Sequence, residues 1–274
     1  MEKTQSIGFL GAGNMGGAII DGLLAKQFVP AGNIGASARN QDKLRAFCQP
    51  RGVRVCDNKT LIRECPILVV GLKPTMFDEV LPPLVPLMEK HTKLVISIAA
   101  GLSLERLSCI FGKQIPLIRT MPNMNARIGQ SMTGVCASGN VSEPDKAYVL
   151  ELLGCVGQTM IVPEGNFPIF SALAGASPAY SFMFIEALAK AGVKDGMTKA
   201  DATKAAAQAV LGSAQFLLQQ LEEGRHPMAL VDGICSPGGT TIAGVTVLEQ
   251  KAFTGTVMDA ALVTAQRDRD LFSK

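Results

Sequence analysis

SIGFLGAGNMGGAII, residues 6–20, is the stretch that decides the fold. Its first five residues form an apolar run typical of a buried strand, and an amphipathic helix pattern follows. Between the two, GAGNMG (11–16) has the spacing GxGxxG in the strand–turn–helix context that gives this motif meaning. Gly11 permits a tight turn, Gly13 lets the backbone approach a pyrophosphate, and Gly16 lets the helix pack on the sheet. The stretch predicts a dinucleotide site, and the alternative is a glycine-rich turn in an unrelated α/β protein.

The alternation of strand and helix patterns continues to about residue 162. Amphipathic stretches such as 14–27 and 40–48 separate the apolar runs. This spacing indicates βαβ units and a parallel sheet, and the nearly continuous apolar strands indicate that helices cover both faces. The runs are SIGFL (6–10), NIGAS (33–37), ILVVGL (67–72), KLVISIA (93–99), PLIRTM (116–121), SMTGVCA (131–137) and CVGQTMIV (155–162).

Beyond Val162 the chain is rich in Ala, Leu, Met and Gln, and strand patterns nearly vanish. We predict an α/β fold with an N-terminal Rossmann-type domain, 1–162, and a C-terminal all-helical domain, 163–274. Apolar faces such as AAAQAVLGSAQFLLQQL favour packing against a second subunit, and the alternative is that they only close the chain's own core. The expected helices are 170–192, with a kink or break at Pro178, about 199–223, and two that begin near Thr240 and Thr254.

The end of the second strand indicates which dinucleotide binds. GASARNQDK (35–43) has no acidic residue at the strand end, where NAD enzymes usually hold the ribose hydroxyls. It has Ser37 and Arg39 instead, and an arginine there can accept a 2′-phosphate. We therefore predict NADP(H), with NAD(H) as the alternative cofactor. A solvated surface charge is the other interpretation of Arg39.

Composition excludes several classes of function. The net charge is +3 with both signs interspersed, which argues against a nucleic-acid surface. The seven cysteines are scattered and form no CxxC pair, so we expect reduced thiols and no metal site. The absence of a long uncharged run or a secretion signal predicts a cytoplasmic protein with no membrane span. With two histidines in the chain, catalysis by a buried histidine has little support.

Further segments fall at the ends of predicted strands and in the helical half. The strand ends are GLKP (71–74), SIAAG (97–101) and RTMPN (119–123), and the helical half contains ALAGASPAY (172–180) and DGICSPGGTTIAG (232–244). Open α/β sheets bind ligands at these carboxyl ends. Together with GAGNMG, the segments resemble the pyrroline-5-carboxylate reductases over almost the whole chain. That resemblance implies NADPH-dependent reduction of a cyclic imine to proline. The partner of the protein would then be a small molecule, 1-pyrroline-5-carboxylate.

The resemblance also implies roles for individual residues. Ser236, Gly239, Thr240 and Thr241 would bind the substrate, and interlocked helical domains would form a homodimer, with a larger ring of dimers as a further assembly. In this family the substrate loop completes a site on the partner's nucleotide domain. The cofactor residues would be Gly11, Ala12, Gly13, Asn14, Met15 and Gly16 at the pyrophosphate, Ser37, Arg39 and Asn58 near the adenosine side, and Leu72, Lys73, Pro74, Ile98, Ala99 and Ala100 beside the nicotinamide.

The SPGGTT bend has a physical interpretation of its own. A Gly-Gly bend exposes backbone amides, and a helix N-terminus attracts a carboxylate. Thr241 is our candidate for a hydrogen bond to the ring nitrogen, while helix capping is a simultaneous role for the hydroxyls. Hydride transfer to an imine requires mainly that the two reactants are held in near-attack geometry. Lys73 is expected to face solvent, with Pro74 at the start of a helix.

Three further side chains leave alternatives open. Arg119 either attracts the substrate carboxylate or makes a structural hydrogen bond. Tyr180 is expected to be a buried phenol with a local partner, and the alternative is a proton-donating acid. Glu186 is either a contact to a second subunit or the polar edge of its helix.

Two departures from the family pattern keep other functions open. The chain has GASPAY (175–180) where the family commonly has GSGPAY, and MPNMN (121–125) where it commonly has MPNTP. These departures are the support for an NADP(H)-binding regulatory protein without turnover. A relative of the β-hydroxyacid dehydrogenases is the third hypothesis. That group uses a lysine in a mid-chain helix, whereas the predicted helix 170–192 has only Lys190, near its end.

Overall fold

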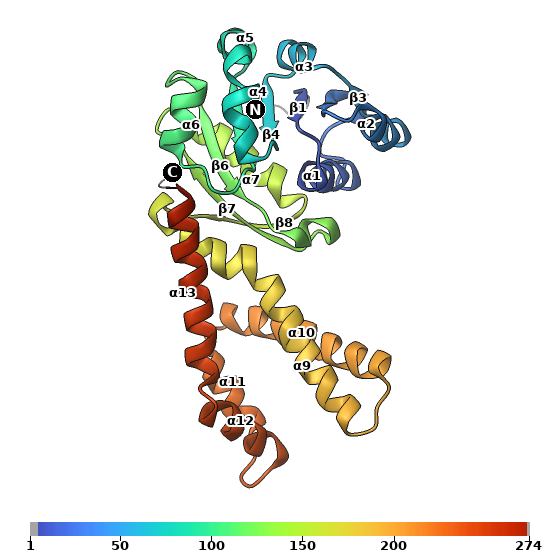
Figure 1. Cartoon of the computed structure of the whole chain (residues 1–274), viewed down its shortest axis with the longest axis vertical. Coiled ribbons are helices and arrows are strands. Elements are labelled where there is room, and N and C mark those ends of the chain that lie inside the picture. The colour runs from blue at the N-terminus through green and yellow to red at the C-terminus, as the bar shows by residue number, and fades with distance from the viewer. Residues whose placement is uncertain (1–4, 273–274) are drawn as a thin grey trace. The chain divides into compact units, whose positions relative to one another are not determined.

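The computed structural model describes residues 5–272, which divide into two compact units (Figure 1). One unit contains the chain up to Gly175 together with the segment from Thr264 onward, and the other contains Ala176–Val263. The first unit is a sheet with helices on both faces, and the second is entirely helical.

The sheet has eight strands in the order β3-β2-β1-β4-β5-β6-β7-β8, and every neighbouring pair is parallel except β6 and β7. All seven predicted apolar runs form strands. The bounds are β1 Ile7–Leu10, β2 Ile34–Ser37, β3 Arg54–Val55, β4 Ile67–Val70, β5 Leu94–Ser97, β6 Leu117–Met121, β7 Ser131–Ala137 and β8 Gly157–Ile161.

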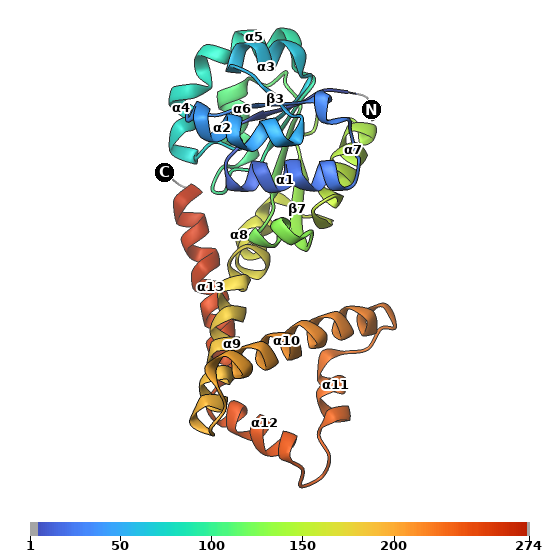
Figure 2. The same ribbon diagram turned by 90° about the vertical axis from the view of Figure 1, so that its right-hand side faces the viewer.

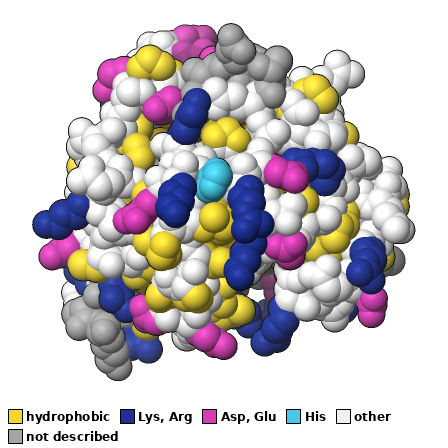
Figure 3. Space-filling model, turned by 90° about the horizontal axis from the view of Figure 1, so that it is seen from above, with side chains coloured by type: hydrophobic (Ala, Val, Ile, Leu, Met, Phe, Trp, Pro, Cys, Tyr) yellow, Lys and Arg dark blue, Asp and Glu magenta, His cyan; other side chains and the backbone are white. Residues whose placement is uncertain are grey.

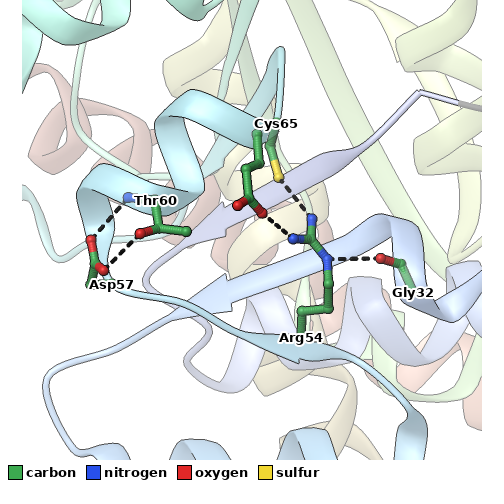
Figure 4. Close-up of polar contacts among 6 residues, drawn as sticks. Gly32, Arg54, Asp57, Thr60 and Cys65 are labelled. Carbon is green, nitrogen blue, oxygen red and sulfur yellow. Dashed lines mark hydrogen bonds and ion pairs between the residues drawn. The ribbon is translucent and has the colours of Figure 1, made fainter.

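Strand β3 is the one that the apolar pattern missed. It pairs with β2 through two residues and lies at the edge of the sheet. The Arg54 side chain secures it: Nε donates to the Gly32 carbonyl at 2.8 Å, Nη2 donates to Cys65 Sγ at 3.7 Å, and Nη1 pairs with Glu64 (Figure 4). Tertiary contacts thus hold a segment whose local sequence has no strand signal.

Helices pack on both faces of the sheet, as predicted from its apolar strands (Figure 2). On one face Ile19 and Leu23 pack with Leu152, and on the other Phe77 packs edge-on against Phe111. The helices of this unit are α1 Asn14–Ala25, α2 Gln41–Cys48, α3 Asn58–Glu64, α4 Phe77–Val80, α5 Val85–His91, α6 Leu104–Phe111, α7 Glu143–Gly154 and α8 Phe167–Phe170.

The helical part begins with an unbroken helical stretch. A π-helical segment, Ser171–Ala176, follows α8 and leads directly into α9, Ser177–Lys194. Pro178 lies in the first turn of α9, and the helical stretch continues through it, so it does not break the helix as one alternative had it. The Ala174 carbonyl, four residues earlier, accepts from the Asn123 side chain instead. The stretch Glu164–Lys194 is long and apolar enough to span a membrane by length and composition alone, criteria that core helices also meet.

The remaining helices are α10 Lys199–Glu222, α11 Pro227–Ile234, α12 Thr240–Gln250 and α13 Phe253–Phe272. Helices at the positions of α10, α12 and α13 were predicted, but α11 was missed. Its N-cap is His226, whose Nδ1 accepts from the Met228 amide at 3.2 Å, and histidine is not one of the usual capping residues. All seven cysteines are free thiols.

Candidate functional site

The turn between β1 and α1 is shaped by Gly11 and Gly71. Gly11 has φ +95°, and its amide and that of Ala12 both donate to the Ser37 carbonyl, at 3.0 and 3.1 Å. A Cβ on Gly71 would lie 2.7 Å from the Gly11 carbonyl oxygen. The turn after β1 and the turn after β4 therefore touch backbone to backbone, and only glycines permit that approach. The sequence motif identified Gly11 but gave no reason to single out Gly71.

Gly13 and Gly16 have the different environments that the motif predicts. A Cβ on Gly13 would meet no atom within 4 Å, so the space above this residue is open. At Gly16 a Cβ would lie 3.2 Å from the Gly11 carbonyl oxygen and 3.6 Å from Phe9. Helix α1 starts at Asn14, and the Gly17 amide donates a hydrogen bond to the Gly13 carbonyl at 2.7 Å. The amides of the first turn precede that bond, which suits an anion at this end of the helix.

A cavity of about 440 Å³ lies beside this turn. Ser37 is only 2% exposed. Its hydroxyl oxygen is buried and has no hydrogen-bond partner within residues 5–272. A buried hydroxyl in that state is suited to a bound polar group. The predicted residues on the cavity wall are Gly11, Ser37, Arg39, Asn58 and Leu72, and the others include Gln41, Cys56, Asp57, Met76 and Glu79.

Asp57 is a wall residue that the sequence analysis did not select. It caps α3 by accepting from the amides of Lys59 and Thr60 and from the Thr60 hydroxyl. Figure 4 shows the bonds that it accepts from Thr60. Those bonds, Thr60 first, hold the pKa of Asp57 below its usual range. The carboxylate therefore fixes the start of the helix on which Asn58 is the first residue. The signal for it was the capping residue before NKT.

The turns after β4 and β5 form the next part of this edge. A Cβ on Gly71 would lie 3.1 Å from Ile98 Cδ1, so the two predicted nicotinamide segments meet. Ala99 is buried and Ala100 is exposed. Lys73 is exposed, and Pro74 begins a 3-10 helix directly after it, as we expected from the KP turn. The ammonium group of Lys73 is therefore exposed to solvent, as predicted.

The MPN segment closes the edge after β6. Thr120 donates its hydroxyl to the Ser97 carbonyl at 2.9 Å, which joins the ends of β5 and β6. The buried Asn123 donates to the Ala174 carbonyl at 2.9 Å and accepts from the Asn125 amide at 3.0 Å. Asn125, which departs from the family pattern, therefore takes part in the turn through its backbone. Sequence analysis named this loop without identifying Thr120 or Asn123.

Arg119 has the structural role that was one of its two interpretations. Its side chain is 5% exposed, and its Nη1 donates to Glu164 Oε1 at 3.0 Å. The guanidinium carbon lies 4.1 Å from the centre of the Phe167 ring. Burial lowers the pKa of Arg119, and Glu164 opposes that shift. The charge is committed inside the fold, so recruitment of a substrate carboxylate is not its role.

In the helical unit, the predicted substrate residues form the entry to α12. Gly238 has φ +68°, and the Gly239 amide donates to the Ser236 carbonyl at 3.0 Å. Gly239 is the N-cap of α12 and has no side-chain cap, so the expected capping by the threonine hydroxyls is wrong. Thr240 and Thr241 are instead the first two helical residues, and both are exposed. Their hydroxyls are therefore not used for capping.

Two other side chains of this unit were open questions. Tyr180 is half-buried rather than buried, and its hydroxyl donates to the Ala260 carbonyl at 3.4 Å. Glu186 pairs with Lys199 at 2.5 Å and with Lys190 at 3.7 Å, which makes it a polar edge of its helix. Both have local structural partners.

The predicted cofactor and substrate residues do not line a second cavity of the unit that contains the sheet. A cavity of about 560 Å³ lies between α1 and the segments 126–130 and 154–158. On the face shown in Figure 3, Lys and Arg side chains are interspersed with Asp and Glu. Among residues 5–272, no group of three or more His, Cys, Asp or Glu side chains is arranged to hold a metal ion.

Two family models match the chain, one in each half. Residues 164–271 match the model for pyrroline-5-carboxylate reductase dimerisation, and residues 6–101 match that for coenzyme F420-dependent NADP oxidoreductases. The boundary of the first match lies three residues beyond the end of β8.

Individual relatives are similar over nearly their whole length. The pyrroline-5-carboxylate reductase of Escherichia coli K12 is 40% identical over 99% of both chains. The crystal structure of the Streptococcus pyogenes enzyme of that name is also 40% identical, with a TM-score of 0.86 over 98% of this chain and 100% of that one. The Plasmodium falciparum enzyme, solved with NADP bound, is 28% identical, with a TM-score of 0.87 over 99% and 100%.

Proposed function

The chain belongs to the pyrroline-5-carboxylate reductase family, and from that premise we propose how its residues bind and align the two reactants. It is an NADP(H)-dependent oxidoreductase that reduces 1-pyrroline-5-carboxylate to L-proline, the final step of proline biosynthesis. The observation that carries this conclusion is the 40% identity across 99% of both chains. Nothing in these similarities favours a regulatory protein without turnover or a β-hydroxyacid dehydrogenase relative.

The turn after β1 is the proposed site of the cofactor pyrophosphate. The open space at Gly13 leaves room for a phosphate, and the amides of the first turn of α1 point to where it would bind. The residues that would hold it are Gly11, Ala12, Gly13, Asn14, Met15 and Gly16. When bound, NADPH supplies the hydride from C4 of its nicotinamide.

The cavity wall is the proposed site of the adenosine 2′-phosphate. The unpartnered Ser37 hydroxyl and the exposed Arg39 guanidinium, both on the wall, can donate to phosphate oxygens. Asn58 lies on the same wall, on a helix that Asp57 fixes. The preference for NADPH over NADH is therefore assigned to Ser37 and Arg39.

The nicotinamide would lie against the turns after β4 and β5. These turns are apolar on the side where Leu72 and Ile98 lie, and apolar walls exclude water from a hydride donor. The proposed lining is Leu72, Lys73, Pro74, Ile98, Ala99 and Ala100.

The substrate is proposed to bind at the entry to α12. The carboxylate would accept from the amides of the Gly238–Gly239 bend, where the helix dipole is positive. Ser236, Gly239 and Thr240 would hold it there. Thr241 would hydrogen-bond the ring nitrogen through its hydroxyl, and the proton that the imine needs would either arrive with the substrate or pass through this hydroxyl from solvent. This chemistry requires no histidine, because an imine nitrogen is itself basic.

The assembly is proposed to be a homodimer through the helical domain 163–274, with the Rossmann domain 1–162 carrying the cofactor. The match to a dimerisation family over residues 164–271 supports the dimer. A ring of dimers is a further proposal that rests on the family resemblance. A cytoplasmic location is another, and it rests on the seven scattered cysteines, which are expected to be reduced thiols.

The test is oxidation of NADPH followed at 340 nm with 1-pyrroline-5-carboxylate, beside NADH. We expect turnover with NADPH to exceed turnover with NADH. Thr241→Ala should lower kcat by about 10- to 100-fold, since a hydrogen bond made to a charged centre is lost. Thr241→Ser is the matched control and should keep most of the activity. NADPH binding without any turnover would overturn the reductase, and equal rates for the two Thr241 variants would overturn the role of the hydroxyl.

A further inference from the structure

The loop between β5 and α6, residues 98–103, is held at both of its ends by side chains from other elements. At its start, the Thr120 hydroxyl donates to the Ser97 carbonyl at 2.9 Å. At its end, the Leu104 amide donates to Glu164 Oε1 at 2.6 Å. Glu164 lies 60 residues farther along the chain, in the 3-10 turn Glu164–Asn166. The proposed nicotinamide residues Ile98, Ala99 and Ala100 lie between these two anchors.

We infer that Glu164 is a positioning residue for the reaction: its carboxylate fixes the nicotinamide loop 98–103 through the Leu104 amide. The inference rests on the proposed function, which places this loop at the nicotinamide. Glu164 touches no reacting atom and acts only through the loop that it holds.

The position of Leu104 explains why an outside acceptor matters. Leu104 is the first residue of α6, so its amide has no acceptor within the helix. The Ser103 side chain caps the helix at the Arg106 amide, at 3.0 Å, and leaves the Leu104 amide to another partner. Glu164 is that partner. A carboxylate is favourable at this end of a helix because the dipole there is positive.

Arg119 keeps the Glu164 carboxylate in place. Its Nη1 donates to the same oxygen, Oε1, at 3.0 Å, and its own side chain is packed against the Phe167 ring. A buried guanidinium without a carboxylate is costly, so the fold strongly favours the paired arrangement. Arg119 is a residue of β6, so this strand helps to fix the position of Glu164 Oε1, the oxygen that accepts from the Leu104 amide.

Glu164 also lies at a boundary along the chain. It is the first residue of the segment that matches the dimerisation family. One carboxylate therefore joins the nicotinamide loop to the point where the helical half of the chain begins. A loop held in its bound conformation loses less entropy when a ligand arrives, so binding and alignment both improve.

The test compares two ligands on the full-length protein: NADPH, which reaches the loop, and adenosine 2′,5′-bisphosphate, which has no nicotinamide. We expect Glu164→Ala to weaken NADPH binding about tenfold and to lower kcat, because a charged hydrogen bond is lost. Binding of the bisphosphate should change less than about twofold. Glu164→Gln keeps an acceptor oxygen and should restore most of the NADPH affinity.

A second variant removes the bond without exposing Arg119. Leu104→Pro removes the amide hydrogen at the first helical position, where proline is well tolerated, and keeps the Glu164–Arg119 pair. It also removes a leucine side chain that packs on the core, so Leu104→Ala, which keeps the amide, is measured beside it. Leu104→Pro should show the same selective loss of NADPH affinity. It also keeps the inference testable if Glu164→Ala does not fold.

The matched control is Glu64→Ala. It removes the acidic partner of another partly buried arginine, Arg54, at the β3 edge of the sheet (Figure 4). Both affinities should stay within about twofold of the wild-type values. Unchanged NADPH affinity in both Glu164→Ala and Leu104→Pro, or equal losses for the two ligands, would overturn the inference. Turnover by the wild-type protein tests the proposed function separately, because the two affinities do not depend on turnover.

Discussion

The unit that contains the sheet, which we call the nucleotide-binding unit, and the helical unit Ala176–Val263 differ in how they bury apolar side chains. The first packs Phe, Leu, Ile and Val on both faces of its sheet. In the second, the buried hydrophobic residues are the small side chains of Ala189, Ala202 and Ala206. Most of the large exposed hydrophobic side chains of the described chain lie in the second unit, among them Met183, Leu211, Phe216, Leu218, Val257 and Met258.

The difference shows that the first unit assembles its proposed site within one chain, whereas the helical unit leaves apolar surface uncovered. The sheet brings the Gly11 turn, Ser37, Asn58 and the ends of β4 to β6 together within one chain. The helices carry large apolar side chains that a single chain leaves in contact with water. Contiguous exposed apolar surface marks an interface, so the helical unit is expected to be completed by a second copy. The following experiments test this contrast.

The largest effect is expected from Leu218→Asp on α10. Leu218 is 62% exposed in the single chain, and in the dimer the aspartate would be a buried charge without a partner. We expect the dimer dissociation constant to rise at least about 100-fold, measured by sedimentation. Binding of adenosine 2′,5′-bisphosphate should persist, because the nucleotide unit has its own core.

Leu218→Met is the control for that experiment and should remain dimeric. If Leu218→Asp were still a dimer at micromolar concentration, α10 would not lie in the interface. If bisphosphate binding were lost as well, the independence of the nucleotide unit would be wrong.

Gly13→Val is the converse experiment. A Cβ at Gly13 would meet no atom of residues 5–272 within 4 Å, and the backbone has φ −81°, so the fold should accept valine. The side chain would occupy the proposed phosphate position, so NADPH affinity should fall about 100-fold while the melting temperature and the dimer are retained.

Gly11→Ala separates the two roles of glycine in this motif. It places a Cβ at φ +95° and 3.0 Å from the Gly71 carbonyl, so it should lower the melting temperature as well as the affinity. A stable Gly13→Val protein that binds NADPH normally would contradict the proposed phosphate site.

The smallest effect is expected at Asp268, on α13. Burial raises its pKa, while Arg119, Ser171 and Arg269 oppose the shift, and its Oδ2 is buried without a partner within residues 5–272. The stability that this carboxyl contributes is therefore fullest below its ordinary pKa, near about 4, and is lost as pH rises through the raised value. Asp268→Asn should melt at a slightly higher temperature than wild type at pH 7, and the difference should vanish toward about pH 3.5.

Asp270→Asn, two residues away on the exposed side of the same helix, is the control for replacing a carboxylate by an amide on α13. A lower melting temperature for Asp268→Asn at pH 7 would show that its charge stabilises Arg119 by more than its burial costs.

Local pattern predicted most of the elements. All seven of the apolar runs that were predicted as strands formed strands, because they alternate with helices that bury them in a parallel sheet. Strand β3 and helix α11 were missed for physical reasons: β3 is two residues held by Arg54, and α11 is eight residues behind a histidine cap. In both, tertiary contacts or an uncommon cap replace the local signal.

The sequence by itself determined the sheet, the glycine turn, the candidate cofactor residues and the helical second half, because each depends on periodicity or on a short motif. Tertiary structure alone decided that Gly71 meets Gly11 and that Glu164 accepts from both Arg119 and Leu104. It also decided that the Ser37 hydroxyl is buried and has no partner among residues 5–272. The two contacts of Glu164 join it to residues that lie 45 and 60 positions earlier in the chain. Their physical reason is strand order and register, which bring distant side chains together and leave no trace in the local sequence.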